Sequence, residues 1–141
     1  MISKNKLILV KEQELNYNIQ VKSNIDTINF LENILKLQEE PEEVFICITL
    51  DTKNTINGYF EIARGGINFC NISIQNLFKR ILISNCNKFI VAHNHPSGDN
   101  TESKEDIITT RKIEEIANIL GLQLLDSLIV ADTSKSIMNL I

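Results

Sequence analysis

Short apolar runs alternate along the chain with segments whose apolar residues recur every three or four positions, and this alternation predicts an α/β fold. Residues 44–50, VFICITL, are almost entirely β-branched or aromatic, which favours a strand buried on both faces. Residues 51–54 supply a turn, and residues 55–64 are expected to return as the antiparallel partner. Further strands are predicted at residues 6–10, 88–92, 122–131 and 136–141.

Three segments carry the helical pattern. The first begins at Ser23 or the residue after it and ends near Pro41. The second covers residues 73–85, and the third covers residues 104–120 with Gly121 placed to end it. No repeat or linker interrupts this order, so the whole chain, residues 1–141, is expected to form a single domain. Its predicted fold class is α/β, a mixed β-sheet flanked by helices.

The composition is that of an ordinary soluble protein. Hydrophobic residues make up 43% and charged residues 23% of the 141 positions, which allows a full core. No apolar run approaches the roughly 20 residues that span a bilayer. The N-terminus lacks the features of a signal peptide, so we expect a cytoplasmic protein. The net charge of −4 argues against a dedicated nucleic-acid binder, which would carry a basic surface.

The two histidines of the chain stand two residues apart in KFIVAHNHPSGDNTESKED, residues 88–106. Side chains at positions i and i+2 of an extended segment point to the same side, so His93 and His95 can aim both imidazoles at one point. They also follow the carboxyl end of a predicted strand, where the ligand crevices of α/β proteins usually open. On these grounds alone, a metal site and a solvated pair of loop histidines explain the pattern equally well.

Asp106 is the candidate third ligand, because a catalytic zinc takes three protein groups and leaves a fourth position for water. It lies in the first turn of a predicted helix, where the helix dipole favours its anionic form. Two nitrogens and one oxygen suit zinc best, with iron and manganese as alternatives. Ser103 has two interpretations: the N-cap of a capping box with Asp106, or a hydroxyl that donates to an oxyanion.

Glu61, on the predicted strand 55–64, is the candidate base. A lone glutamate on a strand usually faces solvent. If this strand lies beside residues 88–92, however, Glu61 can reach the attacking water and take its proton. Of the other carboxylates, Asp99 is interpreted as a turn former and spare ligand, and Glu105 as exposed.

Together these residues follow one pattern: H-x-H, seven residues, S, two residues, D, with a glutamate upstream. The pattern resembles the JAMM (MPN+) metalloprotease motif. The chain is also similar to the RadC-type JAB domains of bacteria and mobile elements over about residues 44–130. The segments that carry this similarity are AHNHPSGD, SKED and GLQLLDSLIV. The resemblance implies a cytidine-deaminase-like α/β fold with Zn²⁺ held by His93, His95 and Asp106. It further implies that Glu61 activates the water and that Ser103 helps to stabilise the tetrahedral intermediate.

The chain departs from this pattern in two places. RadC-type domains usually read E-x-F-x-G-T where this chain has EIARGG, so Ala63 replaces an aromatic residue and Gly66 a threonine. They also usually carry Pro-Arg-Glu ahead of the following helix, where this chain has IQN at residues 74–76. These changes leave the metal set whole and remove any substrate or partner contacts that the replaced residues make. Residues 1–43 do not match the helix-hairpin-helix region of longer RadC proteins, so a DNA role inherited through it is not supported.

Two functions are therefore weighed. The first is a zinc-dependent hydrolase that cleaves a peptide or isopeptide bond in a peptide or protein substrate. The alternative is a non-enzymatic, DNA-associated accessory factor of the RadC family with a structural metal, which a basic surface would favour and the acidic net charge does not. A zinc nucleobase deaminase shares the expected fold but needs a P-C-x-x-C pair, which the sequence lacks.

Overall fold

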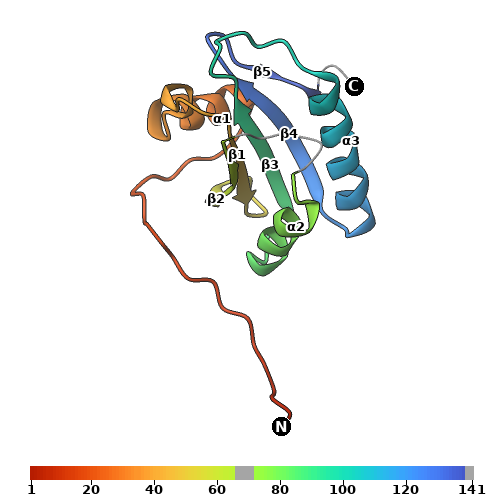
Figure 1. Ribbon diagram of the computed structural model, residues 1–141. Helices are drawn as coiled ribbons and strands as arrows, with labels where there is room; N and C mark the ends of the chain where they lie inside the picture. The colour runs from red at the N-terminus through yellow and green to blue at the C-terminus, as the bar shows by residue number, and fades with distance from the viewer. Residues whose placement is uncertain (66–71, 139–141) are drawn as a thin grey trace.

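One mixed sheet forms the centre of the structure, a computed structural model that describes residues 1–65 and 72–138 (Figure 1). Its strands are β1 (Val44–Leu50), β2 (Ile56–Arg64), β3 (Lys88–Asn94), β4 (Gln123–Val130) and β5 (Lys135–Ser136). Their spatial order is β2-β1-β3-β4-β5, with β3 and β4 parallel and the other neighbouring pairs antiparallel. The predicted α/β class with a mixed sheet is therefore confirmed.

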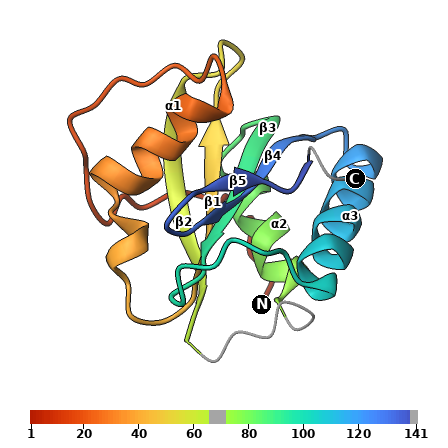
Figure 2. The ribbon, with the colours of Figure 1, turned by 90° about the horizontal axis from the view of Figure 1, so that it is seen from above.

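Helices cover both faces of this sheet. They are α1 (Asn24–Asn29), the π-helical η1 (Phe30–Ile34), the 3₁₀ turn η2 (Leu37–Glu39), α2 (Ile74–Ile83) and α3 (Lys104–Ile119). Figure 2 shows α1 on one side of the sheet and α2 and α3 on the other. Each face therefore encloses its own apolar core, which explains why every residue of β1 is buried. None of the described helices has both the length and the apolar character needed to cross a membrane.

In the central strands, successive side chains point alternately to the two faces of the sheet. Phe45 of β1 pairs with His93 of β3, and Phe45 belongs to the core beneath α2 and α3. The next pair, Ile46 and Ala92, belongs to the core on the α1 face. Because successive side chains of a strand point to opposite faces, Asn94 follows Ala92 to the α1 face while His93 points the other way.

Most predicted elements are confirmed to within two residues. This holds for the strands at residues 44–50, 55–64 and 122–131 and for the helices at residues 73–85 and 104–120. Ser23 is the N-cap of α1, and Gly121 follows α3 with φ of 73°. The strand predicted at residues 88–92 runs two residues further, so His93 lies inside β3 and not beyond it.

The strand predicted at residues 6–10 is wrong. This segment is extended but pairs with no described strand, and Leu7 and Val10 are 81% and 78% exposed. Contact between the N-terminal segment and the sheet begins later, at Ile19, whose carbonyl accepts from the N–H of Ile56, and at an isolated bridge between Gln20 and Thr55. Apolar and β-branched residues favour a strand only where they can pack on a sheet. They do not form one where the segment has no neighbouring strand to pair with.

The first helix and the last strand are only partly as predicted. The helix that Ser23 caps continues from α1 into the π-helical η1 at Phe30, where Phe30 and its neighbour Leu31 are both buried. It breaks at Lys36, whose φ of 53° is left-handed. The last strand is the short β5, which begins one residue before the predicted 136–141. Residues 139–141 lie outside the described part of the chain, as does Gly66.

Candidate metal centre

β3, the residue after it and the first turn of α3 bring the three predicted ligands together. His93 is 2% exposed, and its ring stacks on Phe45 with 6.2 Å between the ring centroids. His95 follows β3, and its backbone N–H donates to the carbonyl of Val130 on β4. Asp106 is 3% exposed in the first turn of α3. Each side chain offers one ligand atom, and these atoms all lie within 4.8 Å of one another.

The loop between β3 and α3 is fastened to the turn between β4 and β5, which explains why α3 begins beside the histidines. The side chain of Asn100 donates to the carbonyl of Thr133 at 2.7 Å. The backbone N–H of Asp132 donates to the carbonyl of Gly98 at 3.2 Å. Gly98 has φ of 83°, and a Cβ there would lie 2.5 Å from the Asp132 carboxylate, so glycine permits this close contact.

The ligand atoms converge at distances that suit a metal ion. Nε2 of His93 lies 3.0 Å from Nε2 of His95 and 3.4 Å from Oδ1 of Asp106. Nε2 of His95 lies 3.5 Å from Oδ2 of Asp106. Atoms bound at about 2.1 Å to a tetrahedral zinc are separated from one another by roughly 3.4 Å. The observed spacing is that of a small cation site.

Two further features show that these residues fit a cation. Oδ1 of Asp106 is buried and has no hydrogen-bond partner among the described residues, which is costly unless something binds it. Nδ1 of His95 lies 2.8 Å from the carbonyl oxygen of Asp99. Because a carbonyl only accepts, Nδ1 carries the proton and Nε2 keeps the lone pair that a metal needs.

The surroundings of the three side chains shift their pKa values in different directions. Burial lowers the pKa of His93. The pKa of His95 is raised, chiefly because its ring lies beside the Asp106 carboxylate. Burial alone would raise the pKa of Asp106, but the close contacts of its carboxylate with both histidine rings outweigh burial and hold that pKa well below its ordinary value. At pH 7 the carboxylate is therefore ionised and His93 is neutral, as metal ligands must be.

Ser103 forms the predicted capping box. Its Oγ accepts from the backbone N–H of Asp106 at 3.0 Å, and Oδ2 of Asp106 accepts from the backbone N–H of Ser103 at 2.9 Å. A hydroxyl that accepts one bond keeps its own proton to donate, so the capping role does not block the second predicted role. Glu105 is exposed as predicted. The carboxylate of Asp99 accepts bonds within its own loop, as expected of a turn former.

The structure separates Glu61 from the ligand group. β1 stands between β2 and β3, so the strand of Glu61 does not lie beside the strand of His93, and the condition set for Glu61 to reach the attacking water is not met. The β1 partner of Glu61 is Ile46, which belongs to the core on the α1 face. The carboxylate of Glu61 is exposed and accepts from Nε of Arg64 at 2.6 Å. The catalytic role of Glu61 itself stays a prediction.

Glu43 is a candidate base that the sequence reasoning missed. Phe45 pairs antiparallel with His93, so continuing that register by two residues sets Glu43 opposite His95. Alternation also gives Glu43 the same face as Phe45 and His93. After the larger effects of burial and of Asp106, the negative charge of Glu43 also acts to raise the pKa values of both histidines. Glu43 is identified by the pairing of β1 with β3, and this pairing cannot be read from the sequence alone.

Comparison with known proteins now identifies the fold family. A family model for the RadC-like JAB domain matches residues 21–139. The chain belongs to this family. It is 36% identical over 120 residues to a UPF0758 protein of Staphylococcus haemolyticus (strain JCSC1435), covering 85% of this chain and 52% of that protein. It is 35% identical over 118 residues to a UPF0758 protein of Clostridium beijerinckii, covering 84% and 51% of the two chains.

A third relative, a UPF0758 protein of Clostridium perfringens (strain ATCC 13124), is 40% identical over 91 residues, which cover 64% of this chain and 40% of that protein. The chain thus spans about half the length, or less, of these curated relatives. The RadC-type resemblance is confirmed, and the mixed sheet with helices on both faces is consistent with a JAB fold. The names of the relatives state no reaction, so the reaction has to be inferred from the site.

Proposed function

We propose that this RadC-like JAB domain is a metal-dependent hydrolase, with zinc held by His93, His95 and Asp106. The observation that carries the proposal is the buried Oδ1 of Asp106, which lacks a hydrogen-bond partner among the described residues and lies 3.4 Å from Nε2 of His93. Three protein ligands leave a fourth position open, which is typical of catalytic zinc and not of structural zinc. The proposed substrate is a peptide or isopeptide bond.

A bound zinc would supply a Lewis acid that lowers the pKa of a coordinated water toward ~7 and polarises the substrate carbonyl. The protein would supply the rest. His93 and His95 would stay neutral, and the Asp99 carbonyl would hold the ring of His95 in its ligand orientation. The hydroxyl of Ser103 would donate to the oxygen on which negative charge develops.

Two carboxylates are proposed for the base that takes the proton of the attacking water. The pairing of β1 with β3 favours Glu43, because it gives Glu43 the same face as the histidines. Glu61 is the alternative, and Arg64 would have to release it first. We expect Glu43 to be the base, and one experiment separates the two residues.

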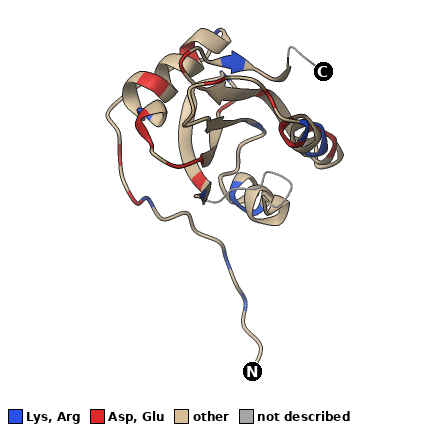
Figure 3. Ribbon diagram, turned by 45° about the horizontal axis from the view of Figure 1, so that its top comes forward, with Lys and Arg blue, Asp and Glu red and all other residues tan. Residues whose placement is uncertain are grey.

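The charge around the site supports a peptide over a nucleic acid as substrate. Glu39, Glu40, Glu42 and Glu43 follow one another along the segment that leads from the N-terminal helices into β1, where Figure 3 shows acidic positions in red. A phosphate backbone would be repelled by this segment. A peptide, which carries no obligatory negative charge, would not be.

The proposal is tested by metal analysis of the purified protein followed by hydrolysis of a fluorogenic peptide library and of isopeptide-linked dipeptides. We expect about one zinc per chain. Glu43→Gln and Glu61→Gln should both keep the zinc, and Glu43→Gln alone should lower hydrolysis by ~100-fold or more, as loss of a general base does.

Each outcome has a definite meaning. Loss of hydrolysis in Glu61→Gln with full activity in Glu43→Gln would make Glu61 the base. A protein that binds zinc tightly yet hydrolyses no member of either substrate set would count against the enzyme and favour a structural metal.

A further inference from the structure

Asn94 separates the two histidine ligands in the sequence, and its side chain faces away from them. It is 1% exposed on the α1 face of the sheet, at the last position of β3. A buried amide there is costly unless both of its ends are bonded, because it offers two donors and one acceptor. The hydrogen bonds of Asn94 therefore indicate what this residue does.

All of the side-chain hydrogen bonds described for Asn94 go to the backbone of the segment that enters β1. Its Oδ1 accepts from the N–H of Val44 at 2.7 Å. Its Nδ2 donates to the carbonyl of Glu42 at 2.9 Å and to the carbonyl of Glu40 at 3.3 Å. One side chain thus holds residues 40–44 against the end of β3, about 50 positions along the chain from itself.

These contacts enclose Glu43 from both sides. Asn94 binds the carbonyl before it and the N–H after it, and the N–H of Gly65 donates to the carbonyl of Glu43 itself at 2.8 Å. The backbone of Glu43 has little freedom to rotate, so its side chain is held on the face of Phe45 and His93.

The neighbouring carboxylates are engaged elsewhere. The guanidinium of Arg64 donates to the carboxylates of Glu40, Glu42 and Glu61 on the α1 side of the sheet. No ion pair is described for Glu43 in the part of the chain that the structure covers. Unlike Glu40, Glu42 and Glu61, Glu43 is therefore not held by Arg64 in the described contacts, and its carboxylate can serve the histidine group.

We infer that Asn94 is a positioning residue, whose amide fixes residues 40–44 so that the carboxylate of Glu43 faces His93 and His95. This inference rests on the proposed function for its catalytic consequence, and on the hydrogen bonds of Asn94 for the placement itself. It also explains why an asparagine stands between the two histidines. His93 and His95 would bind the metal on one face of the sheet, and Asn94 would position Glu43 through hydrogen bonds on the other face.

The first test needs neither metal nor substrate. Asn94→Asp keeps the shape of the side chain but replaces the donating NH₂ with an oxygen that faces two carbonyls. Amide hydrogen exchange at Val44 and Gly65 should become ~10-fold faster or more, since leaving buried polar groups unpaired costs about that factor. Asn94→Ser serves as the second variant if the aspartate variant does not fold.

The same metal-free protein gives a readout that a merely structural role would not produce. The imidazole NMR signals of His93 and His95 should shift in Glu43→Gln, because the nearby carboxylate is lost. They should shift comparably in Asn94→Asp, and the double variant should show no further change. Additive shifts in the double variant, or rings that respond to Glu43→Gln but not to Asn94→Asp, would overturn the inference.

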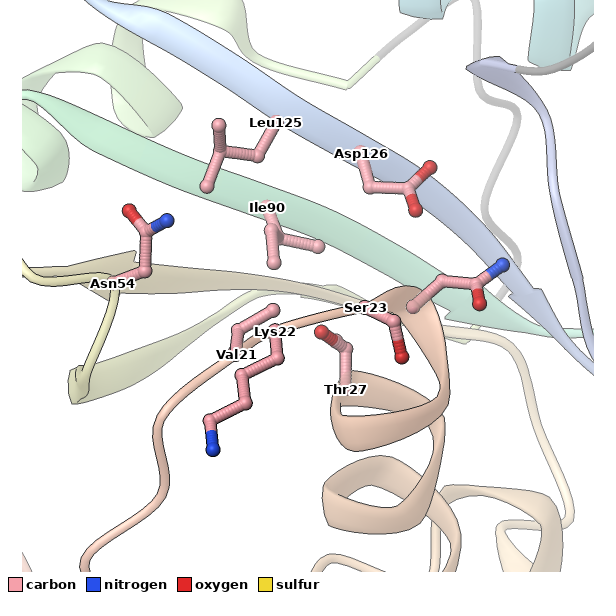
Figure 4. A pocket seen from close by; sticks show the side chains of 9 residues that line it. Val21, Lys22, Ser23, Thr27, Asn54, Ile90, Leu125 and Asp126 are labelled. Carbon is pink, nitrogen blue, oxygen red and sulfur yellow. The ribbon is translucent and has the colours of Figure 1, made fainter.

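Thr27→Val is the matched control. Thr27 is 1% exposed on the same α1 face, beside a cavity of about 190 Å³ that Figure 4 shows in close-up. Its Oγ1 has no hydrogen-bond partner among the described residues, so removing the hydroxyl breaks no described bond. Exchange at Val44 and the histidine signals should be those of the parent protein. A change as large as that in Asn94→Asp would mean that any buried substitution on this face disturbs residue 44.

Hydrolysis then separates this inference from the proposed function. If the parent cleaves peptides, Asn94→Asp should keep its zinc and lose activity by about the same factor as Glu43→Gln, and the double variant should lose no more. Full activity in Asn94→Asp would refute the positioning role while leaving the hydrolase intact. If the parent has no activity, the hydrolase fails, and the exchange and NMR results still decide the placement of Glu43.

Discussion

Two charged clusters lie at the same end of the sheet, on opposite faces, and only one has the features of a site. Arg64 binds the carboxylates of Glu40, Glu42 and Glu61, and the side chains of Arg64 and Glu61 are 41% and 44% exposed. On the other face, the side chains of His93 and Asp106 are 3% and 1% exposed. The first cluster pairs opposite charges in water, and the second brings metal-ligating atoms together out of water.

The difference lies in burial and in unmet bonding capacity. In the exposed cluster every carboxylate has the guanidinium as a partner, and solvent screens what remains. In the buried cluster one carboxylate oxygen lacks a hydrogen-bond partner among the described residues, and two imidazole Nε2 atoms face each other at 3.0 Å. Buried polar atoms without hydrogen-bond partners are costly, and a bound cation would remove that cost, so the buried cluster indicates a ligand. The exposed carboxylates already have a partner and give no such indication.

The largest expected effect comes from removing the charge of the buried cluster. Asp106→Asn keeps an oxygen that can accept from the backbone N–H of Ser103, so the helix cap should survive. Zinc affinity should fall by more than ~100-fold, because changing even a residue that only supports a ligand costs ~10–100-fold. The pKa of His95 should also fall, since the neighbouring carboxylate of Asp106 raises it. Competition with a chromophoric chelator and NMR titration measure the two effects; unchanged zinc affinity would remove Asp106 from the ligand set.

Ser103 gives an intermediate effect and separates its two roles. Ser103→Ala should destabilise the protein by about 1 kcal/mol through loss of the helix cap. Ser103→Asp should restore the cap but not the hydroxyl proton. If Ser103 stabilises the oxyanion, both variants lose hydrolysis while only the alanine variant loses stability, as calorimetry and the peptide assay would show. Full activity in Ser103→Asp would leave Ser103 with the cap alone.

The smallest effect is expected in the exposed cluster. Arg64→Ala removes the partner of three carboxylates, yet the melting temperature should stay within about 2 °C of the parent, because exposed pairs contribute little. Zinc content should not change. A large loss of zinc in this variant would mean that the exposed pairs, and not the amide of Asn94, hold the segment before β1.

The parts of the site that could be predicted are local in the sequence. His93 and His95 share a face because strand side chains repeat every two residues. Asp106 lies in the first turn of α3 because Ser103 and Asp106 cap that helix together. Most strands and helices can likewise be predicted from the spacing of apolar residues along the sequence. The segment at residues 6–10 shows the limit, because it has the composition of a strand and no edge to pair with.

The base could not be chosen in this way. Glu61 and Glu43 are both glutamates next to hydrophobic strand residues, and nothing local distinguishes them. The sheet order β2-β1-β3, the register of Phe45 with His93 and the bonds of Asn94 decide which one shares a face with the histidines. The sequence by itself determined the candidate ligand set, since a two-residue period and a helix cap need only neighbouring residues. Only the tertiary structure decided which glutamate lies on the same face as these ligands. Strand order and pairing depend on contacts between segments some 50 residues apart.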